Sequence, residues 1–304
     1  MTTTGQLVVY AGGGLTPAAC AEIRATGCTG VAIMLNEPPS TVGGRYSKAT
    51  HVDPGTRAAL DAGLSVQWVS WIYDSGDGRA RVYIDAMLAD FGRAAALGVS
   101  SLSVDAEGEW LDGDGAEDAT ATYLAERWRA LRIGLPLWVS SFPAAFKRPS
   151  KLSRLLELAT ATGGGAIPQA YSLAPESARF AWRSAPSAAP DVMAAQSVRD
   201  ARAAGAGRVA VAVAGWGEPL PGYDARGMLR AARQSAAFVG VGDIYVWWWP
   251  ALRGSGGAAA ARRAELASWR ATGKSAGGGG GWGRKLVVVA VLGLVVEGVR
   301  RWIL

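Results

Sequence analysis

Short apolar segments and segments with helical periodicity alternate along this chain, and this alternation restricts its fold more than any other feature. The apolar segments have the length and β-branched content of strands and lie at residues 6–12, 30–36, 65–74, 101–110, 136–143, 166–172, 208–217 and 243–250. The remaining periodic segments predict helices that begin at residue 17 and lie at residues 54–62, 79–97, 118–131, 151–160, 193–204, 224–238 and 258–272. Strands that alternate with helices pair in parallel, because each helix returns the chain to the same edge of the sheet. Eight such units over about 270 residues predict an α/β fold, a single (β/α)8 barrel of the TIM type, which we assign to residues 1–274.

An open, doubly wound sheet is the rival fold, and it would place a glycine-rich phosphate-binding turn after an early strand. The residues that follow the first strand, AGGG at 11–14, are rich in glycine but lack the G-x-G-x-x-G spacing. Glycine also precedes most of the later strands, where a left-handed residue ends the helix before it, at Gly27, Gly63, Gly98, Gly134, Gly164, Gly205 and Gly242. We therefore prefer the closed barrel.

Three carboxylates cluster near the end of the fourth predicted strand, in the stretch SLSVDAEGEW at residues 101–110. Successive side chains of a strand point to opposite faces, so Asp105, Glu107 and Glu109 share one face. Carboxylates on one face repel each other and raise each other's pKa, and this repulsion does not help a fold to be stable. A glycosidase does need carboxyl groups with different pKa values, because one carboxyl group must stay protonated while a neighbour stays ionised.

Aromatic and amide side chains are predicted at the ends of several other strands. In barrel enzymes the carboxyl ends of the strands carry the active site. The candidates for substrate binding at that end are Trp71, Tyr73, Gln169, Trp216, Trp247 and Trp249, with Tyr171 as a further candidate for the catalytic group. Sugar rings stack their C–H faces on tryptophan, and their hydroxyl groups need polar partners, so this composition is typical of a carbohydrate cleft.

The composition argues against several other chemistries. The chain has one histidine, His51, and two cysteines, Cys20 and Cys28, so a metal centre, a Ser–His triad or a disulfide framework is not expected. The net charge of +6 is scattered without a basic stripe, which predicts no nucleic-acid binding and a mild attraction to anionic surfaces. We predict neither a metal nor a cofactor.

The acid cluster resembles the motifs of two glycoside hydrolase families. Asp105-Ala106-Glu107 is similar to the Asp-x-Glu of the Chalaropsis-type lysozymes, barrel enzymes often found as phage endolysins. That resemblance implies Glu107 as the acid and Asp105 as the group that assists the substrate's acetamido group. The same stretch resembles the tail of the chitinase pattern D-x-x-D-x-D-x-E, which would make Glu109 the acid, although Leu102 stands where that pattern has its first Asp. Which glutamate is the acid stays open.

Gln169-Ala170-Tyr171 on the sixth predicted strand is also similar to both families, which place a tyrosine there to bind the acetamido oxygen. Both families imply one mechanism, in which the substrate's own acetamido carbonyl attacks the anomeric carbon. The resemblance therefore implies a glycosidase for N-acetylhexosamine polymers, peptidoglycan or chitin-like, with a phage or prophage cell-wall lytic enzyme as one form. A barrel that binds glycan without cleaving it, as an adhesion or virion component, and a hydrolase for other polysaccharides are the alternatives.

The two ends of the chain suggest where it acts. The first residues, MTTTGQLVVYAGGG, lack the pattern of a Sec signal peptide. Residues 275–283, SAGGGGGWG, predict a flexible linker, and residues 284–304 predict a hydrophobic helix whose uninterrupted apolar part, 286–296, is shorter than a spanning helix needs. We expect this helix to contact a membrane, with docking on a protein as the alternative. The expected localisation is therefore membrane-associated or virion-associated, acting on the cell wall.

Overall fold

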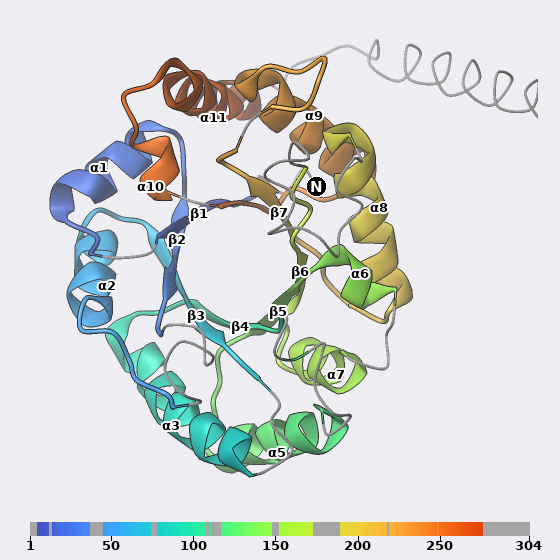
Figure 1. The fold of residues 1–304 in the computed structure, drawn as a ribbon. Helices are drawn as coiled ribbons and strands as arrows, with labels where there is room; N and C mark the ends of the chain where they lie inside the picture. The colour runs from blue at the N-terminus through green and yellow to red at the C-terminus, as the bar shows by residue number, and fades with distance from the viewer. Residues whose placement is uncertain are drawn as a thin grey trace, which may run out of the picture. The chain divides into compact units, whose positions relative to one another are not determined.

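Eight parallel strands form one sheet that curls into a barrel (Figure 1). The structure is a computed structural model that describes residues 5–11, 14–36, 45–73, 78–107, 110, 117–147, 152–172, 189–217, 219–247 and 249–275. The strands are β1 Leu7–Ala11, β2 Gly30–Met34, β3 Ser65–Trp71, β4 Ser101–Asp105, β5 Leu137–Ser141, β6 Gly165–Pro168, β7 Val211–Ala214 and β8 Ile244–Trp247. They pair in the order β6-β5-β4-β3-β2-β1-β8-β7. The predicted (β/α)8 barrel is confirmed.

The barrel closes between β6 and β7, the two ends of that order. Two isolated parallel bridges join them, Ala166 with Val209 and Gln169 with Ala212. A side chain on Gly165 could not be accommodated, because its Cβ would lie 2.1 Å from the carbonyl oxygen of Arg208. Glycine at this position therefore allows the close backbone approach that completes the ring.

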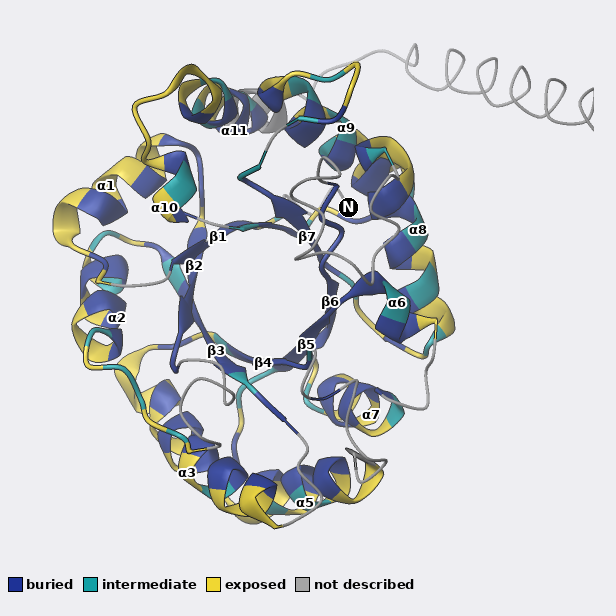
Figure 2. Ribbon diagram, viewed as in Figure 1, coloured by how far each residue is buried: buried dark blue, intermediate teal, exposed yellow. Residues whose placement is uncertain are grey.

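Helices cover the outside of the barrel, and their inner faces are buried while their outer faces are exposed (Figure 2). They are α1 Pro17–Ala25, α2 Val52–Asp61, α3 Arg79–Ala94, the 3-10 turn η2 Ala95–Leu97, α5 Glu117–Ala130, α6 Pro143–Phe146, α7 Ser153–Ala161, α8 Pro190–Ala203, α9 Ala225–Phe238, α10 Trp249–Leu252 and α11 Gly257–Ser275. Thr16 caps α1 by accepting a hydrogen bond from the Ala19 amide at 3.2 Å, with proline at the first helical position. The short helices α6 and α10 were not predicted, and each follows directly after a strand end.

Large and small side chains alternate around the barrel interior. Strand β7 and the residue before it contribute Ala210, Ala212 and Ala214, while the neighbouring positions hold the rings of Tyr245 and Tyr171. Filling a closed barrel requires such complementary volumes, because the inward side chains of all strands converge on one axis.

The chain divides into two units, Met1–Ser268 and Trp269–Leu304, and the barrel belongs to the first. Within the described residues of both units, no helix combines the length and the apolar character needed to cross a bilayer. The predicted linker, apart from Ser275 at the end of α11, and the predicted hydrophobic helix at 284–304 lie outside the described residues.

Left-handed residues end the helices, but not always at the predicted glycine. Gly27, Gly98 and Gly205 adopt φ of 86°, 84° and 97° as expected, and so does Gly63 at 71°. After α5 the left-handed residue is Arg132, at φ 52°, instead of Gly134. The helix ends two residues earlier than the glycine pattern suggests, and a residue with a Cβ takes the strained position.

Replacing Arg132 by glycine is therefore expected to stabilise the protein. The Cβ of the exposed Arg132 is sterically strained in the left-handed region, and glycine removes this strain. Glycine also makes the unfolded chain more flexible, which offsets part of the gain in stability. We expect Arg132→Gly to raise the free energy of unfolding by about 0.5–1 kcal/mol in denaturant titrations. Arg132→Ala, which keeps a Cβ, is the matched control, and an equal gain for both variants would contradict the explanation.

Candidate active site

The predicted acid cluster lies at the carboxyl end of β4. The strand ends at Asp105, five residues earlier than predicted, but the chain continues beside β5 for one more residue. The Ala106 amide donates to the Ser140 carbonyl at 2.9 Å, and the Ser141 hydroxyl donates to the Ala106 carbonyl at 2.5 Å. The alternation of side chains therefore continues, and Glu107 follows Asp105 on the barrel side of the chain.

The other face of this segment is apolar and fully buried. Leu102, Val104 and Ala106 each have 0 % exposure. The division of the segment into an acidic and an apolar face thus agrees with the sequence pattern for Asp105 and Glu107. Glu109 lies outside the described residues.

One amide nitrogen holds the two carboxylates together. Gln169 Nε2 lies 2.8 Å from Asp105 Oδ1, 2.6 Å from Glu107 Oε1 and 3.0 Å from the Ser140 hydroxyl oxygen. An amide nitrogen is a donor only, so its hydrogens point toward the negative oxygens. Asp105 is almost completely buried, at 1 % exposure, and a buried carboxylate needs such a donor.

A cavity of about 350 Å³ opens over this cluster. It is lined by Trp71, Glu107, Phe142, Gln169, Tyr171, Trp216 and Trp247. Every one of these residues is the last of its strand or follows the strand end within a few positions. The cavity therefore lies at the carboxyl end of the barrel, and the structure brings six of the predicted site residues together there.

Aromatic contacts and backbone hydrogen bonds fix the wall of this cavity. The rings of Tyr171 and Trp216 meet edge to face, with centroids 4.9 Å apart, and those of Tyr10 and Trp247 lie 4.5 Å apart. The Trp71 amide donates to Asn36 Oδ1 at 3.3 Å, and the Tyr83 hydroxyl donates to the Trp71 carbonyl at 2.7 Å. Neighbouring elements thus hold the wall in place.

Two predicted substrate-binding residues are not brought to this cavity. Strand β3 ends at Trp71, so the alternation that would aim Tyr73 inward has stopped, and Tyr73 packs edge to face on Tyr83 with centroids 5.1 Å apart. Strand β8 ends at Trp247, and Trp249 begins α10 and lines a different pocket. In both cases the strand is shorter than the apolar run in the sequence.

Two residues near the site did not enter the predicted set. Phe142 lines the cavity from the end of β5, and Tyr10 faces the barrel interior from β1. The alternation in LVVYA on β1 was a signal for Tyr10, because Val8 and Tyr10 share the inward face.

The two tyrosines beside the carboxylates stay protonated. Burial raises the pKa of Tyr171 well above its ordinary value, and the negative charges of Asp105 and Glu107 raise it further. Burial likewise raises the pKa of Tyr10, and Asp105 adds to the effect. Both phenols therefore remain O–H donors at the pH values at which carboxylates ionise.

These raised pKa values predict a loss of stability in alkali. Above about pH 10 the unfolded chain releases its tyrosine protons while the folded chain keeps those of Tyr10 and Tyr171, so unfolding becomes easier by about 1.4 kcal/mol per pH unit for each tyrosine. Below that pH the contribution is fully present. Denaturant titrations at pH 9 and pH 11 should show a smaller alkaline loss for Tyr171→Phe than for wild type. Equal losses in the two proteins would show that Tyr171 ionises in the folded state.

Within the described part of the chain, no group of three or more His, Cys, Asp or Glu side chains is arranged to hold a metal ion. The candidate site therefore consists of two carboxylates, their shared amide, two phenols and a ring of aromatic side chains.

No protein-family model matches this sequence, and no curated protein matches it. Solved structures do share its fold. The spore cortex-lytic enzyme SleL of Bacillus cereus is 11% identical with a TM-score of 0.56, and the match covers 88% of this chain and 75% of that one. The PgaB (BpsB) glycoside hydrolase domain from Bordetella bronchiseptica is 11% identical with a TM-score of 0.53, covering 87% and 99%. The ChiA C-terminal domain of Legionella pneumophila is 13% identical with a TM-score of 0.52, covering 86% and 96%. At these identities the likeness is one of fold.

Proposed function

We propose that this protein is a glycoside hydrolase that cleaves a polysaccharide containing N-acetylhexosamine, such as peptidoglycan or a chitin-like polymer. The observation that carries the proposal is the contact of one amide nitrogen, Gln169 Nε2, with both Asp105 and Glu107 at the base of an aromatic cavity. The names of two solved structures with the same barrel, a spore cortex-lytic enzyme and a glycoside hydrolase domain, are consistent with it.

The wall of the cavity suits a sugar. Trp71, Trp216 and Trp247 offer flat apolar faces for the C–H faces of pyranose rings. Glu107, Gln169 and the Tyr171 hydroxyl offer polar groups for hydroxyl and acetamido substituents. A cleft for an entirely apolar ligand would have no use for the carboxylates.

Glu107 is the proposed general acid and base, because it lines the cavity while Asp105 lies beneath it. In the first step the substrate's acetamido carbonyl oxygen bonds to the anomeric carbon, the glycosidic C–O bond breaks, and Glu107 gives its proton to the leaving oxygen. In the second step Glu107 takes a proton from water, the water oxygen bonds to the anomeric carbon, and the acetamido oxygen leaves. The electron pairs and protons balance without a nucleophile from the protein.

The remaining groups orient the acetamido group. Asp105, which lies beneath Glu107, is proposed to assist the acetamido group through its negative charge, which stabilises the positive charge that forms when the carbonyl oxygen attacks. The protonated Tyr171 is proposed to donate to that carbonyl oxygen and hold it in line with the anomeric carbon. Because the acetamido oxygen is held beside the anomeric carbon of the same sugar, its attack is an intramolecular step and needs no encounter with a separate nucleophile.

A barrel that binds glycan without cleaving it is the second candidate. The observation in its favour is Leu102, a fully buried residue where the chitinase pattern has its first aspartate. Such a barrel would serve in adhesion or as a virion component, and it predicts sugar binding without product.

The residues 284–304 are proposed to hold the enzyme at a membrane or virion surface, from which it acts on the cell wall. The basis is the sequence alone, with its apolar run at 286–296 and its flanking arginines. The full-length chain is expected to sediment with vesicles rich in anionic lipid. A chain with Leu294→Asp and Val295→Asp should stay in the supernatant, and equal sedimentation of both chains would contradict the proposal.

The glycosidase activity predicts that the full-length protein clears suspensions of purified cell walls or releases reducing ends from chitin. General acid–base catalysis contributes about 10²–10⁴-fold, so Glu107→Gln should lower the rate at least about a hundredfold. Asp105→Asn should also lower it, because an amide cannot stabilise the positive intermediate. Reducing-end release, measured on both polymers, is the readout.

Glu157→Gln on the surface of α7 is the matched control and should keep the wild-type rate. Glu109→Gln tests the other register of the resemblance, since full loss there with a normal rate for Glu107→Gln would make Glu109 the acid. De-N-acetylated polymer should resist cleavage if the acetamido group takes part. Wall binding without any product would favour the non-catalytic barrel.

A further inference from the structure

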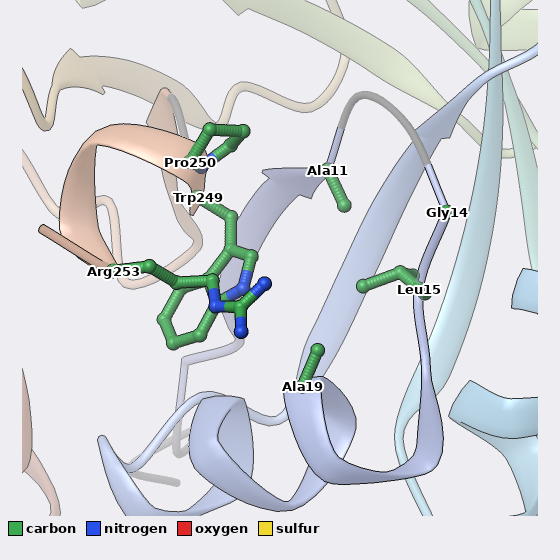
Figure 3. A pocket seen from close by; sticks show the side chains of 7 residues that line it. All are labelled: Ala11, Gly14, Leu15, Ala19, Trp249, Pro250 and Arg253. Atoms are coloured by element: carbon green, nitrogen blue, oxygen red, sulfur yellow. The ribbon is translucent and has the colours of Figure 1, made fainter.

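A second pocket lies on the other side of the barrel wall, between β1, α1 and α10 (Figure 3). It has a volume of about 310 Å³, and its lining includes Ala11, Leu15, Ala19, Trp249, Pro250 and Arg253. The two cavities are lined by different residues near the end of β8. Trp247 lines the candidate active site and Trp249 lines this pocket, and none of the residues of one lining belongs to the other.

Trp249 brings a hydrogen-bond donor that has no partner among the described residues. The side chain is buried, at 3 % exposure, and its Nε1 atom neither reaches solvent nor finds an acceptor in the described part of the chain. An indole N–H can only donate. Buried donors are nearly always satisfied in folded proteins, so an orphan donor at a pocket wall points to an acceptor on a ligand.

Arg253 adds a positive charge beside this donor. Arg253 and Trp249 both line the pocket, and in Figure 3 their side chains extend from α10 and the residue after it, across the pocket from Leu15 and Ala19. Its Nε atom lies 3.3 Å from Glu22 Oε2 on the outside, and the described residues offer the guanidinium no other side-chain partner. A guanidinium has five donors and a planar fork that matches a carboxylate.

The described residues of the lining offer no side-chain acceptor. The other lining residues are alanine, glycine, leucine and proline, so the pocket combines the Trp249 indole N–H, the Arg253 guanidinium with its partner Glu22 on one side, and aliphatic side chains. This set disfavours cations and favours a ligand whose oxygens accept hydrogen bonds. A singly charged acceptor with a small apolar substituent fits it best.

We propose that this pocket binds a carboxylate that carries a short alkyl group, with the oxygens on Trp249 Nε1 and Arg253 and the alkyl group against Leu15 and Ala19. The carboxylate is either part of the polysaccharide or a free small acid. The first of these sources rests on the proposed function. Both sources share the chemistry that the pocket recognises. The pocket lies at the same end of β1 and β8 as the candidate active site.

Calorimetric titration of the full-length protein distinguishes these sources without using activity. The probes are D-lactate, N-acetylmuramic acid, which carries a lactyl carboxylate on a sugar, N-acetylglucosamine, which lacks it, and inorganic phosphate. Both carboxylates are expected to bind, and Arg253→Gln is expected to weaken their binding about tenfold or more, since charge-assisted hydrogen bonds are lost. Trp249→Phe keeps the ring, removes the N–H and should weaken binding by a smaller factor.

The controls make the outcome decisive. Arg199→Gln, an exposed arginine of α8, should bind as wild type does, and Arg253→Lys should retain part of the affinity because it keeps the charge. Tighter binding of N-acetylmuramic acid than of D-lactate, lost in Arg253→Gln, would support a polymer-borne carboxylate, and equal binding would support a free acid. Carboxylate binding that Arg253→Gln leaves unchanged, or a preference for phosphate, would overturn the proposal. A protein that binds carboxylate here but cleaves no glycan would refute the proposed function alone.

Discussion

Closure of the sheet between β6 and β7 is the constraint on which the rest of the structure depends. Among the described residues, two isolated bridges join the ends of these strands, whereas every other neighbouring pair forms a continuous ladder. Gly165 permits the close approach of the two backbones, and Gln169 supplies one of the two bridges. The side chain of the same Gln169 reaches past the intervening strand β5 to Asp105 and Glu107 on and after β4. The residue that helps to complete the ring therefore also sets the distance between the two carboxylates.

The electrostatics of the site follow from that geometry. Two carboxylates that share one amide nitrogen lie close together, and one of them is buried. Burial of the neighbouring phenols raises the pKa of Tyr10 and of Tyr171, the negative charges of the carboxylates raise both pKa values further, and the phenols stay protonated. Donors and acceptors are thus separated in space, with acceptors at the end of β4 and O–H donors on β1 and after β6. Chemistry on a substrate with an amide substituent needs both kinds of group.

The sequence was sufficient to predict the barrel, its eight strands and the cluster at the end of β4, because alternation and helical periodicity carry that information directly. It was poor at locating strand ends. The apolar runs around Tyr73 and Trp249 continue past the last paired residue, so inward positions were assigned to residues that lie in a loop and in a helix. Pairing ends where a neighbouring strand ends, and a single sequence does not contain that information. Arg132 shows the same limit for helices, since the left-handed residue after α5 is not the nearest glycine.

The three alanines on and beside β7 have a further consequence. Ala210, Ala212 and Ala214 contribute only methyl groups to an interior where neighbouring positions contribute the rings of Tyr245 and Tyr171. The small side chains of β7 therefore leave room in the interior for the rings of other strands. Substitutions on β7 can therefore change the interior volume while the acids at the end of β4 and their amide partner stay unchanged.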